Sequence, residues 1–272
     1  MRNRGKIFAV ILILVFIVSM TACGGSTNGA VKLKVGASPA PHMEILENVK
    51  PILLEQGIDL EIVEFTDYLM PNIALEEGDI DANYFQHGPY MEDFNAERDG
   101  NLVAAGSIHY EPLGLYPGKS SDLQNVPDGA KIGIPDDATN GGRALLLLEV
   151  QGIITLPTDK DFSKLTKYDI IDNPHNVEII ELEAVQIPAQ LPDLDFAVIN
   201  GNYALSSGIV DTVIVTEDEN SVAVDYANVI AVKSGNENDD AIIKLVEALK
   251  SDVNKEFITS KYGKSVIVYE GE

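Results

Sequence analysis

The chain of 272 residues carries 43 acidic and 19 basic side chains, which gives it a formal net charge of −24 at pH 7. A chain this acidic repels nucleic acid, and it lacks the basic surface that would attract an anionic membrane. Its single cysteine excludes a disulfide framework and a cysteine metal site, and its length suits one large or two modest domains.

The first segment is typical of a secretory signal. Arg2, Arg4 and Lys6 precede an uncharged apolar run over residues 7–20, which is too short to cross a membrane as a helix. The residues Met-Thr-Ala-Cys-Gly-Gly that follow resemble the lipobox of bacterial lipoproteins, in which the cysteine is lipidated and becomes the mature N-terminus. Cys23 is therefore the predicted lipid anchor. The alternative is an ordinary signal peptide followed by an unremarkable cysteine.

The anchor hypothesis divides the N-terminal region into a signal peptide, residues 1–22, and a flexible lipidated tether, residues 23–30. A diacylglyceryl group suits such an anchor better than one acyl chain, because a single chain holds a protein to a membrane only marginally. Loss of the signal removes three positive charges and leaves the mature chain at −27.

Strand-like and helix-like patterns alternate through the rest of the chain, which predicts an α/β fold with largely parallel sheets. Apolar runs predict strands over residues 31–37, 58–65, 102–108, 130–134, 177–180, 195–199, 213–216 and 229–232. Helical spacing predicts helices over residues 42–56, 67–77, 89–98, 139–151, 202–207 and 239–259. A crossing between two lobes is predicted over residues 110–116, and the return crossing near residues 219–226.

An Asp-apolar-Asp sequence occurs in each half of the chain, at residues 79–81 and at residues 193–195. Each is predicted to lead into an equivalent short strand, although coincidence in an acidic chain explains the pattern equally well. In open α/β sheets, ligands bind beyond the carboxyl ends of strands. Phe85, His87 and Asn200 follow these two sequences and are therefore predicted to face one crevice.

Arg143 is predicted to lie in the first turn of the helix that begins at Thr139, where its charge opposes the helix dipole. A bound anion would offset that cost, because the guanidinium can hold a carboxylate through two hydrogen bonds and the helix N-terminus offers free N–H groups. The alternative is a solvated arginine, or one paired with Asp136 or Asp137.

An aromatic group is expected near predicted helix starts and strand ends, with enough apolar surface for an unbranched thioether. Its members are Tyr68, Phe85, His87 and Tyr90. From the residues alone, ordinary core aromatics are the simpler interpretation.

The sequence gives no support for an enzyme. The motifs Gly-x-Ser-x-Gly and His-Glu-x-x-His are absent, and there is no cysteine besides Cys23 to serve as a nucleophile. No activity and no cofactor are therefore predicted. A different alternative is a lipoprotein that captures a metal ion for a metal ABC importer, but the histidines lack the paired spacing of metal ligands. They are His42, His87, His109 and His175.

Four stretches resemble the NlpA/MetQ family of methionine-binding lipoproteins. They are DYLMPNIALEEGDIDANYFQHGPYMEDF (67–94), YEPLGLYPGKSSDLQNVPDGAKIGIPDDATNGGRALLLLEVQGII (110–154), DFAVINGNYALSSG (195–208) and ANVIAVKSG (227–235). The resemblance covers nearly the whole mature chain. It implies a two-lobed, type 2-like periplasmic-binding-protein fold that serves an ABC importer, with L- or D-methionine, or occasionally a methionine dipeptide, in the interlobe cleft. The family pattern Ile-Pro-Asn-Asp is broken here by Asp136.

The resemblance also implies roles for individual residues. The four members of the aromatic group match ligand positions of the family. Asn200 and Asn228 match the side chains that hold the ligand's ammonium and carboxylate groups; by themselves they would be typical of turns or strand ends. With Arg143 on the carboxylate, one ligand would need both lobes.

The implied lobes are lobe 1 over residues 31–112 and 223–272, the latter with the C-terminal helices, and lobe 2 over residues 113–222. The implied partners are methionine, the permease and ATPase of an ABC transporter, and the membrane, which the anchor would hold from its extracytoplasmic face. The protein is expected to act as a monomer.

Overall fold

The computed structural model describes residues 29–161, 164–218 and 225–271. The described residues from Val31 onward belong to one compact unit. The predicted signal peptide and Cys23 lie outside the described residues. Within the described ranges, no helix is both long and apolar enough to span a membrane.

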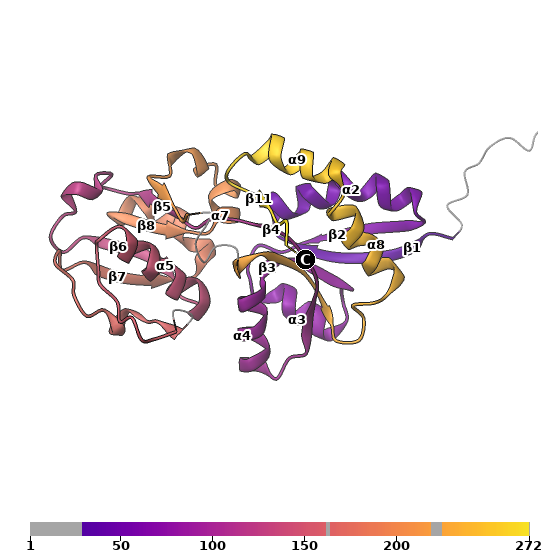
Figure 1. Cartoon of the computed structure of the whole chain (residues 1–272), viewed down its shortest axis with the longest axis horizontal. Coiled ribbons are helices and arrows are strands. Elements are labelled where there is room, and N and C mark those ends of the chain that lie inside the picture. Colours follow the sequence, from indigo (N-terminus) through magenta and orange to yellow (C-terminus); the bar gives the residue numbers. More distant parts are fainter. Residues whose placement is uncertain (1–28, 162–163, 219–224, 272) are drawn as a thin grey trace, which may run out of the picture. The chain divides into compact units, whose positions relative to one another are not determined.

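The first of two sheets has six strands in the order β11-β4-β10-β3-β1-β2. They are β1 (Val31–Ala37), β2 (Ile58–Glu64), β3 (Ala82–His87), β4 (Leu102–Tyr110), β10 (Asn228–Lys233) and β11 (Ile267–Val268). One face is covered by α2 (Glu44–Glu55), α8 (Asp240–Leu249) and α9 (Asp252–Tyr262), and the other by α3 (Met70–Glu77) and α4 (Gly88–Arg98) (Figure 1).

Strand β10 shows how the two-residue period of a strand serves both faces of this sheet. Ile230 and Val232 are buried in the cluster that includes α2 and α8, whereas Val229 and Ala231 are buried with α3 and α4. Both faces of the strand are therefore apolar, as expected where helices cover a sheet on both sides.

The second sheet has five strands in the order β7-β6-β8-β5-β9. They are β5 (Gly114–Pro117), β6 (Lys131–Pro135), β7 (Glu178–Leu182), β8 (Phe196–Ile199) and β9 (Val215–Thr216). Helix α5 (Ala138–Val150) packs on one face, while α6 (Ile187–Gln190) and α7 (Gly201–Ser206) pack on the other. Strand β8 alternates as β10 does, because Phe196 and Val198 face α5 while Ala197 and Ile199 face the other cluster.

The second aspartate of each Asp-apolar-Asp sequence makes the same kind of hydrogen bond in its sheet. The Asp81 carboxylate accepts a hydrogen bond from the backbone N–H of Lys34 in β1 at 2.7 Å. The Asp195 carboxylate accepts one from the backbone N–H of Lys131 in β6 at 2.9 Å. The strands that follow, β3 and β8, lie parallel to β1 and β6. The predicted equivalence of these two strands is therefore confirmed.

The prediction of largely parallel sheets is wrong. Among the strand pairs of the described residues, four are parallel and five antiparallel. The difference arises because β10 runs antiparallel beside β3, and β5 runs antiparallel beside β8. Strand β5 was expected to be part of the crossing; the chain passes between the sheets over residues 111–113.

Two predicted helices need correction. The helix expected over residues 239–259 is two helices, because Ser251 adopts an extended backbone with ψ 151° and its hydroxyl accepts from the N–H of Asn254 to cap α9. The helix expected to follow Asp67 as its cap and to end at Glu77 begins at Met70. The Asp67 side chain accepts hydrogen bonds from the N–H groups of Leu69 and Met70, as a capping side chain does, but the regular helix starts three residues later than the cap. The predicted return crossing lies largely outside the described residues.

Candidate functional site

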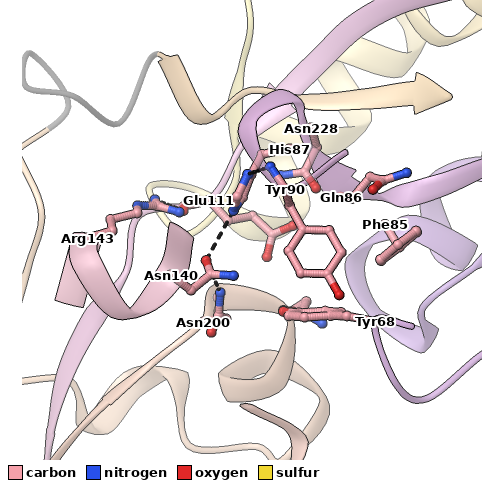
Figure 2. A pocket seen from close by; sticks show the side chains of 12 residues that line it. Tyr68, Phe85, Gln86, His87, Tyr90, Glu111, Asn140, Arg143, Asn200 and Asn228 are labelled. Carbon is pink, nitrogen blue, oxygen red and sulfur yellow. Dashed lines mark hydrogen bonds between the residues drawn. The ribbon is translucent and has the colours of Figure 1, made fainter. Parts of the chain in front are cut away.

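A pocket is lined by residues at the ends of strands of both sheets and in the connections beside them (Figure 2). The lining includes all seven ligand residues predicted from the sequence: Tyr68, Phe85, His87, Tyr90, Arg143, Asn200 and Asn228. It also includes five that were not predicted: Gln86, Glu111, Asn140, Gly201 and Asn202.

The aromatic side of the pocket comes from the six-stranded sheet and its connections. The Tyr68 ring lies 5.8 Å from the Phe85 ring and 5.7 Å from the Tyr90 ring, measured between centroids. The ring of Tyr203, in α7, approaches Tyr68 to 4.9 Å from the other side. Phe85 is only 4% exposed. These rings form an apolar wall of the kind that holds a thioether side chain.

His87 ends β3 and caps α4, which explains its protonation. Its Nδ1 accepts a hydrogen bond from the backbone N–H of Tyr90 at 3.1 Å, so the proton is on Nε2, which donates to Asn140 Oδ1 at 3.1 Å. Burial, and then the charge of Arg143, lower the pKa of His87 to about 3. The residue is thus a neutral link between β3 and α5.

Arg143 is buried, 2% exposed, and pairs with neither of the predicted aspartates. Its Nε donates to Glu217 Oε1 at 2.7 Å and its Nη2 to Glu217 Oε2 at 2.6 Å. Nη2 also donates to the backbone oxygen of Glu111 at 2.8 Å, and the guanidinium lies 4.6 Å from the centroid of the Tyr226 ring. The alternative of a pairing with Asp136 or Asp137 is therefore wrong.

The geometry of α5 explains this correction. Asp137 is the N-cap of the helix, where its carboxylate accepts from the backbone N–H of Asn140 at 2.9 Å and from the Thr139 hydroxyl at 3.0 Å. It is thus occupied at the helix start. Because the helix begins at Ala138, Arg143 lies in the second turn rather than the first, where it reaches Glu217 across the second sheet's edge.

Two asparagines beside β8 present buried polar atoms to the pocket. Asn200 Nδ2 donates to Asn140 Oδ1 at 2.9 Å, and the Tyr68 hydroxyl donates to Asn202 Oδ1 at 2.6 Å. Asn200 Oδ1 and Asn202 Nδ2 are buried and have no hydrogen-bond partner among the described residues. One is an acceptor and the other a donor, and a buried polar atom without a partner is costly. A bound ligand with both a donor and an acceptor would satisfy them.

The remaining predicted residue, Asn228, begins β10 and contacts a buried polar cluster. Its Oδ1 accepts from His42 Nε2 at 3.1 Å, which leaves its amide nitrogen as the donor it offers to the pocket. His42, His109 and Glu111 form the rest of the cluster, with potential ligand atoms within 4.8 Å of one another. Every ring nitrogen of the two histidines already has a hydrogen-bond partner in the protein.

Burial controls the ionisation of this cluster. It lowers the pKa of His42 to about 4 and that of His109 to about 3, and it raises the pKa of Glu111 to about 7. Both histidines are therefore neutral at pH 7. The sequence did not predict their proximity, because His42 and His109 come from separate elements and have no shared spacing.

Helix α7 is tied to the segment before α3 on the other side of the pocket. Besides the bond between Tyr68 and Asn202, the Tyr203 hydroxyl donates to the backbone oxygen of Thr66 at 3.1 Å. Each bond joins the segment after β2, in the six-stranded sheet, to the helix that follows β8, in the five-stranded sheet. They restrain the aromatic wall relative to the asparagines.

Comparisons with known proteins agree with this fold. Residues 33–269 match the family described as NlpA lipoprotein. The methionine-binding lipoprotein MetQ of Bacillus subtilis is 38% identical, over 96% of this chain and 98% of the relative. A nutrient binding protein from Burkholderia cenocepacia, whose structure is bound to methionine, is 38% identical with a TM-score of 0.82, over 87% of this chain and 99% of that one. An ABC transporter periplasmic substrate-binding protein from Coxiella burnetii is 37% identical with a TM-score of 0.81, over 87% and 99%.

The fold and pocket place the chain among two-lobed α/β substrate-binding proteins. It belongs to the NlpA lipoprotein family. The predicted family and fold class are thus confirmed. The family is one of substrate-binding transport proteins, and the comparisons give no support for the metal-capturing alternative.

Proposed function

We propose that this chain is an extracytoplasmic lipoprotein that binds methionine and delivers it to an ABC importer. The observation that carries the proposal is one buried pocket that joins an aromatic wall to unpartnered amide atoms. Its support is the similarity to a methionine-bound structure and to an ABC transporter substrate-binding protein. The wall suits the thioether, and the amides suit a zwitterionic head group.

In the proposed complex, Phe85, Tyr68 and Tyr90 surround the ligand side chain. Asn200 Oδ1 accepts from the ammonium group, and the amide nitrogen of Asn228 donates to the carboxylate. Arg143 uses Nε and Nη2 on protein oxygens, so the ligand carboxylate is placed on Nη1. Because the binding groups come from both lobes, the ligand favours the closed arrangement of the two.

The protein is proposed to bind and release its ligand without chemical change, as a monomer that meets the permease and ATPase of the importer. The predicted lobe boundaries, residues 31–112 with 223–272 and residues 113–222, belong to this proposal. The anchor at Cys23 would hold the protein on the extracytoplasmic face of the cell membrane.

The direct test is mass spectrometry of small molecules released when purified protein is denatured, followed by calorimetry with L-methionine, D-methionine and a methionine dipeptide. A methionine-containing ligand is expected, with binding that EDTA leaves unchanged. Loss of ligand and stability in EDTA would instead indicate a metal-binding protein.

The anchor has a separate test. Cys23→Ser is expected to release the protein from membranes, since the lipid has no other attachment point on this chain. Wild-type protein should stay with the membrane fraction after a high-salt wash. If the variant stays as well, the anchor assignment is wrong.

A further inference from the structure

Glu111 is a buried acid within the pocket that no predicted role explains. It follows β4, where the chain passes between the sheets, and its side chain is 6% exposed. In Figure 2 its carboxylate lies among the labelled side chains, between Asn140 and Tyr90. Burial of a carboxylate is costly unless its oxygens are paired.

The hydrogen bonds of Glu111 are those of an ionised carboxylate. Its Oε1 accepts a hydrogen bond from His109 Nε2 at 2.9 Å and lies 3.3 Å from His42 Nε2. The carboxylate of Glu111 can only accept, so His109 carries its proton on Nε2 and donates it to Glu111, while Tyr84 contacts its Nδ1. The Nε2 proton of His42 goes to Asn228 Oδ1 instead, and this ring lies beside Glu111 as a neutral neighbour. The backbone N–H of Asn202 also donates to the carboxylate. A carboxylate surrounded by donors accepts best when it is charged.

The charges around the pocket leave this carboxylate without a cation. Arg143 is the cation among the described lining residues, and Glu217 neutralises it through two hydrogen bonds. The two histidines that contact Glu111 are neutral rings at pH 7. A ligand with a positive group would therefore meet a buried negative charge that the protein itself does not balance.

We propose that Glu111 is a ligand-binding residue whose carboxylate receives the ammonium group of the ligand. The inference rests on the proposed function, because it takes the ligand to be an α-amino acid. It adds a charged partner to the neutral acceptor Asn200 Oδ1. The ammonium group then lies between a carboxylate from the crossing segment and an amide that follows β8.

This pairing couples binding to a proton. Burial raises the pKa of Glu111 to about 7 in the protein without ligand, so part of the population carries a protonated carboxyl near pH 7. An ammonium group favours the ionised form, so the ligand lowers this pKa and its binding releases protons near pH 7. Below pH 7 the carboxyl takes up its proton more fully, and the affinity for methionine falls.

The groups that face Glu111 do not titrate near pH 7. Burial lowers the pKa of both histidines well below 7, and it raises the pKa of each nearby tyrosine above 10. These groups come from the helical turn η1 (Pro39–Met43), from β4 and β3, from the segment before α3, and from α9. They are His42, His109, Tyr84, Tyr68 and Tyr262. From α5 the facing charge is that of Arg143, a guanidinium that stays charged. The proton released near pH 7 is thus assigned to Glu111.

The experiment compares two ligands and two variants by calorimetry. The ligands are L-methionine and 4-(methylthio)butanoate, which is methionine without its amino group. Glu111→Gln should weaken methionine by about tenfold or more and leave the analogue within about twofold of wild type. Glu149→Gln is the matched control. This partly buried carboxylate lies at the C-terminal end of α5, away from the pocket residues at the start of the helix, and accepts from the N–H of Leu156, so its change should affect neither ligand.

The outcomes separate this inference from the proposed function. Wild-type protein that binds no methionine would contradict the function itself. Wild-type binding with an equal loss of both ligands in Glu111→Gln, or with no loss, would contradict the role of Glu111 alone. If the variant fails to fold, calorimetry of wild type in buffers of different ionisation enthalpy decides. Proton release with methionine and none with the analogue supports the role, and equal release with both overturns it.

Discussion

The two sides of the pocket share a plan and differ in chemistry. On one side, β3 leads from the Asp81 bond to Phe85 and His87; on the other, β8 leads from the Asp195 bond to Asn200 and Asn202. The first side supplies the rings of Tyr68, Phe85 and Tyr90 as well as the Asn228 amide, and the second supplies the other asparagine amides together with Arg143 from α5. The backbone arrangement fixes where each strand ends, and the residues at that end, as in β3, or just beyond it, as after β8, can serve different parts of one ligand.

A second difference concerns titration. The buried histidines His42, His87 and His109 all belong to the six-stranded sheet and its helices. On the opposite side, the buried polar groups that line the pocket are amides and a guanidinium, which keep their charge state across the ordinary pH range. The comparison therefore predicts that the two halves respond differently to acid.

Acid gives the largest expected effect. Burial lowers the pKa values of the three histidines to about 4, 3 and 3, whereas the ordinary pKa of histidine in an unfolded chain is about 6.5. Below pH 6.5 the unfolded chain therefore binds more protons than the folded protein. The free energy of unfolding is therefore unaffected by the histidines above pH 6.5 and falls by about 1.4 kcal/mol per pH unit for each histidine toward pH 4. Glu111 acts in the opposite sense between pH 4.5 and 7, because its pKa is raised in the folded protein, and this offsets the effect of one histidine. Urea unfolding at pH 7, 5.5 and 4.5 should show a loss of several kcal/mol.

Two further measurements sharpen the acid prediction. His109→Gln should reduce the pH slope of stability by about one histidine, and an unchanged slope would contradict the assignment. Amide hydrogen exchange at pH 5 should rise first in the six-stranded sheet. Earlier exchange in the five-stranded sheet would contradict the difference between the halves.

Removal of Arg143 has the next largest effect. Arg143→Ala should weaken methionine by at least about a hundredfold, because a lost buried charge partner costs about 3–5 kcal/mol. The variant should also lose the wild-type preference for methionine over methioninol, which lacks the carboxylate. Calorimetry with both ligands measures this.

Glu217 complicates that variant and also supplies its control. Arg143→Ala leaves the buried Glu217 carboxylate unpaired, so part of the loss could come from a damaged fold. The double variant Arg143→Ala with Glu217→Ala removes both charges and should recover stability in urea without recovering the carboxylate preference. If the double variant binds methionine as wild type does, Arg143 is not the carboxylate partner.

A change in the aromatic wall should alter affinity only for ligands whose side chain contacts that wall. Phe85→Ala should weaken methionine by about tenfold while leaving alanine nearly unchanged, because the lost contacts are apolar and worth about 1.5–3 kcal/mol. Asn200→Ala, on the polar side, should weaken both amino acids alike. Equal losses for both ligands in Phe85→Ala would place the wall elsewhere.

Substitution of the two aspartates that bond to neighbouring strands gives the smallest expected effect. Asp81→Asn and Asp195→Asn should each cost about 1 kcal/mol of unfolding free energy, since each removes the charge from the acceptor of a bond to a neighbouring strand. Asp195 also accepts a longer bond from the Ser120 hydroxyl, at 3.4 Å. The two losses should be similar, and methionine affinity should stay unchanged. Asp79→Asn, at an exposed position, is the control. A large difference between the first two variants would show that the equivalence does not extend to energetics.

Local patterns allowed most elements to be predicted, because strand alternation and helical spacing are properties of neighbouring residues. The break at Ser251 was missed although its cap signal is local, since the apolar spacing continues across it. Strand β5 was missed because its four residues are paired to β8, about 80 residues away, and nothing in the short run marks that partner.

Site residues could be predicted where they fall within a recognisable motif. Their hydrogen-bond partners could not be predicted where they lie far away along the sequence. The seven lining residues came from the family resemblance and from the positions after the strands. Asn140 could have been found, because it lies one turn before Arg143 on the same helix. Glu217 could not, since it is 74 residues from Arg143, and neither could the bond between His42 and Asn228, which are 186 residues apart.

The two hydroxyl bonds that tie α7 to residues 66–68 have a kinetic consequence. They are protein bonds at the pocket, from Tyr68 to Asn202 and from Tyr203 to Thr66, and a ligand contributes to neither. Because Tyr68 and Asn202 line the pocket, we expect these bonds to open before a bound molecule leaves. The dissociation rate would then have an upper limit set by the opening of this pair of bonds, the latch. Ligands of different affinity would then share that limit, and the importer would need to break the latch before it could receive any of them.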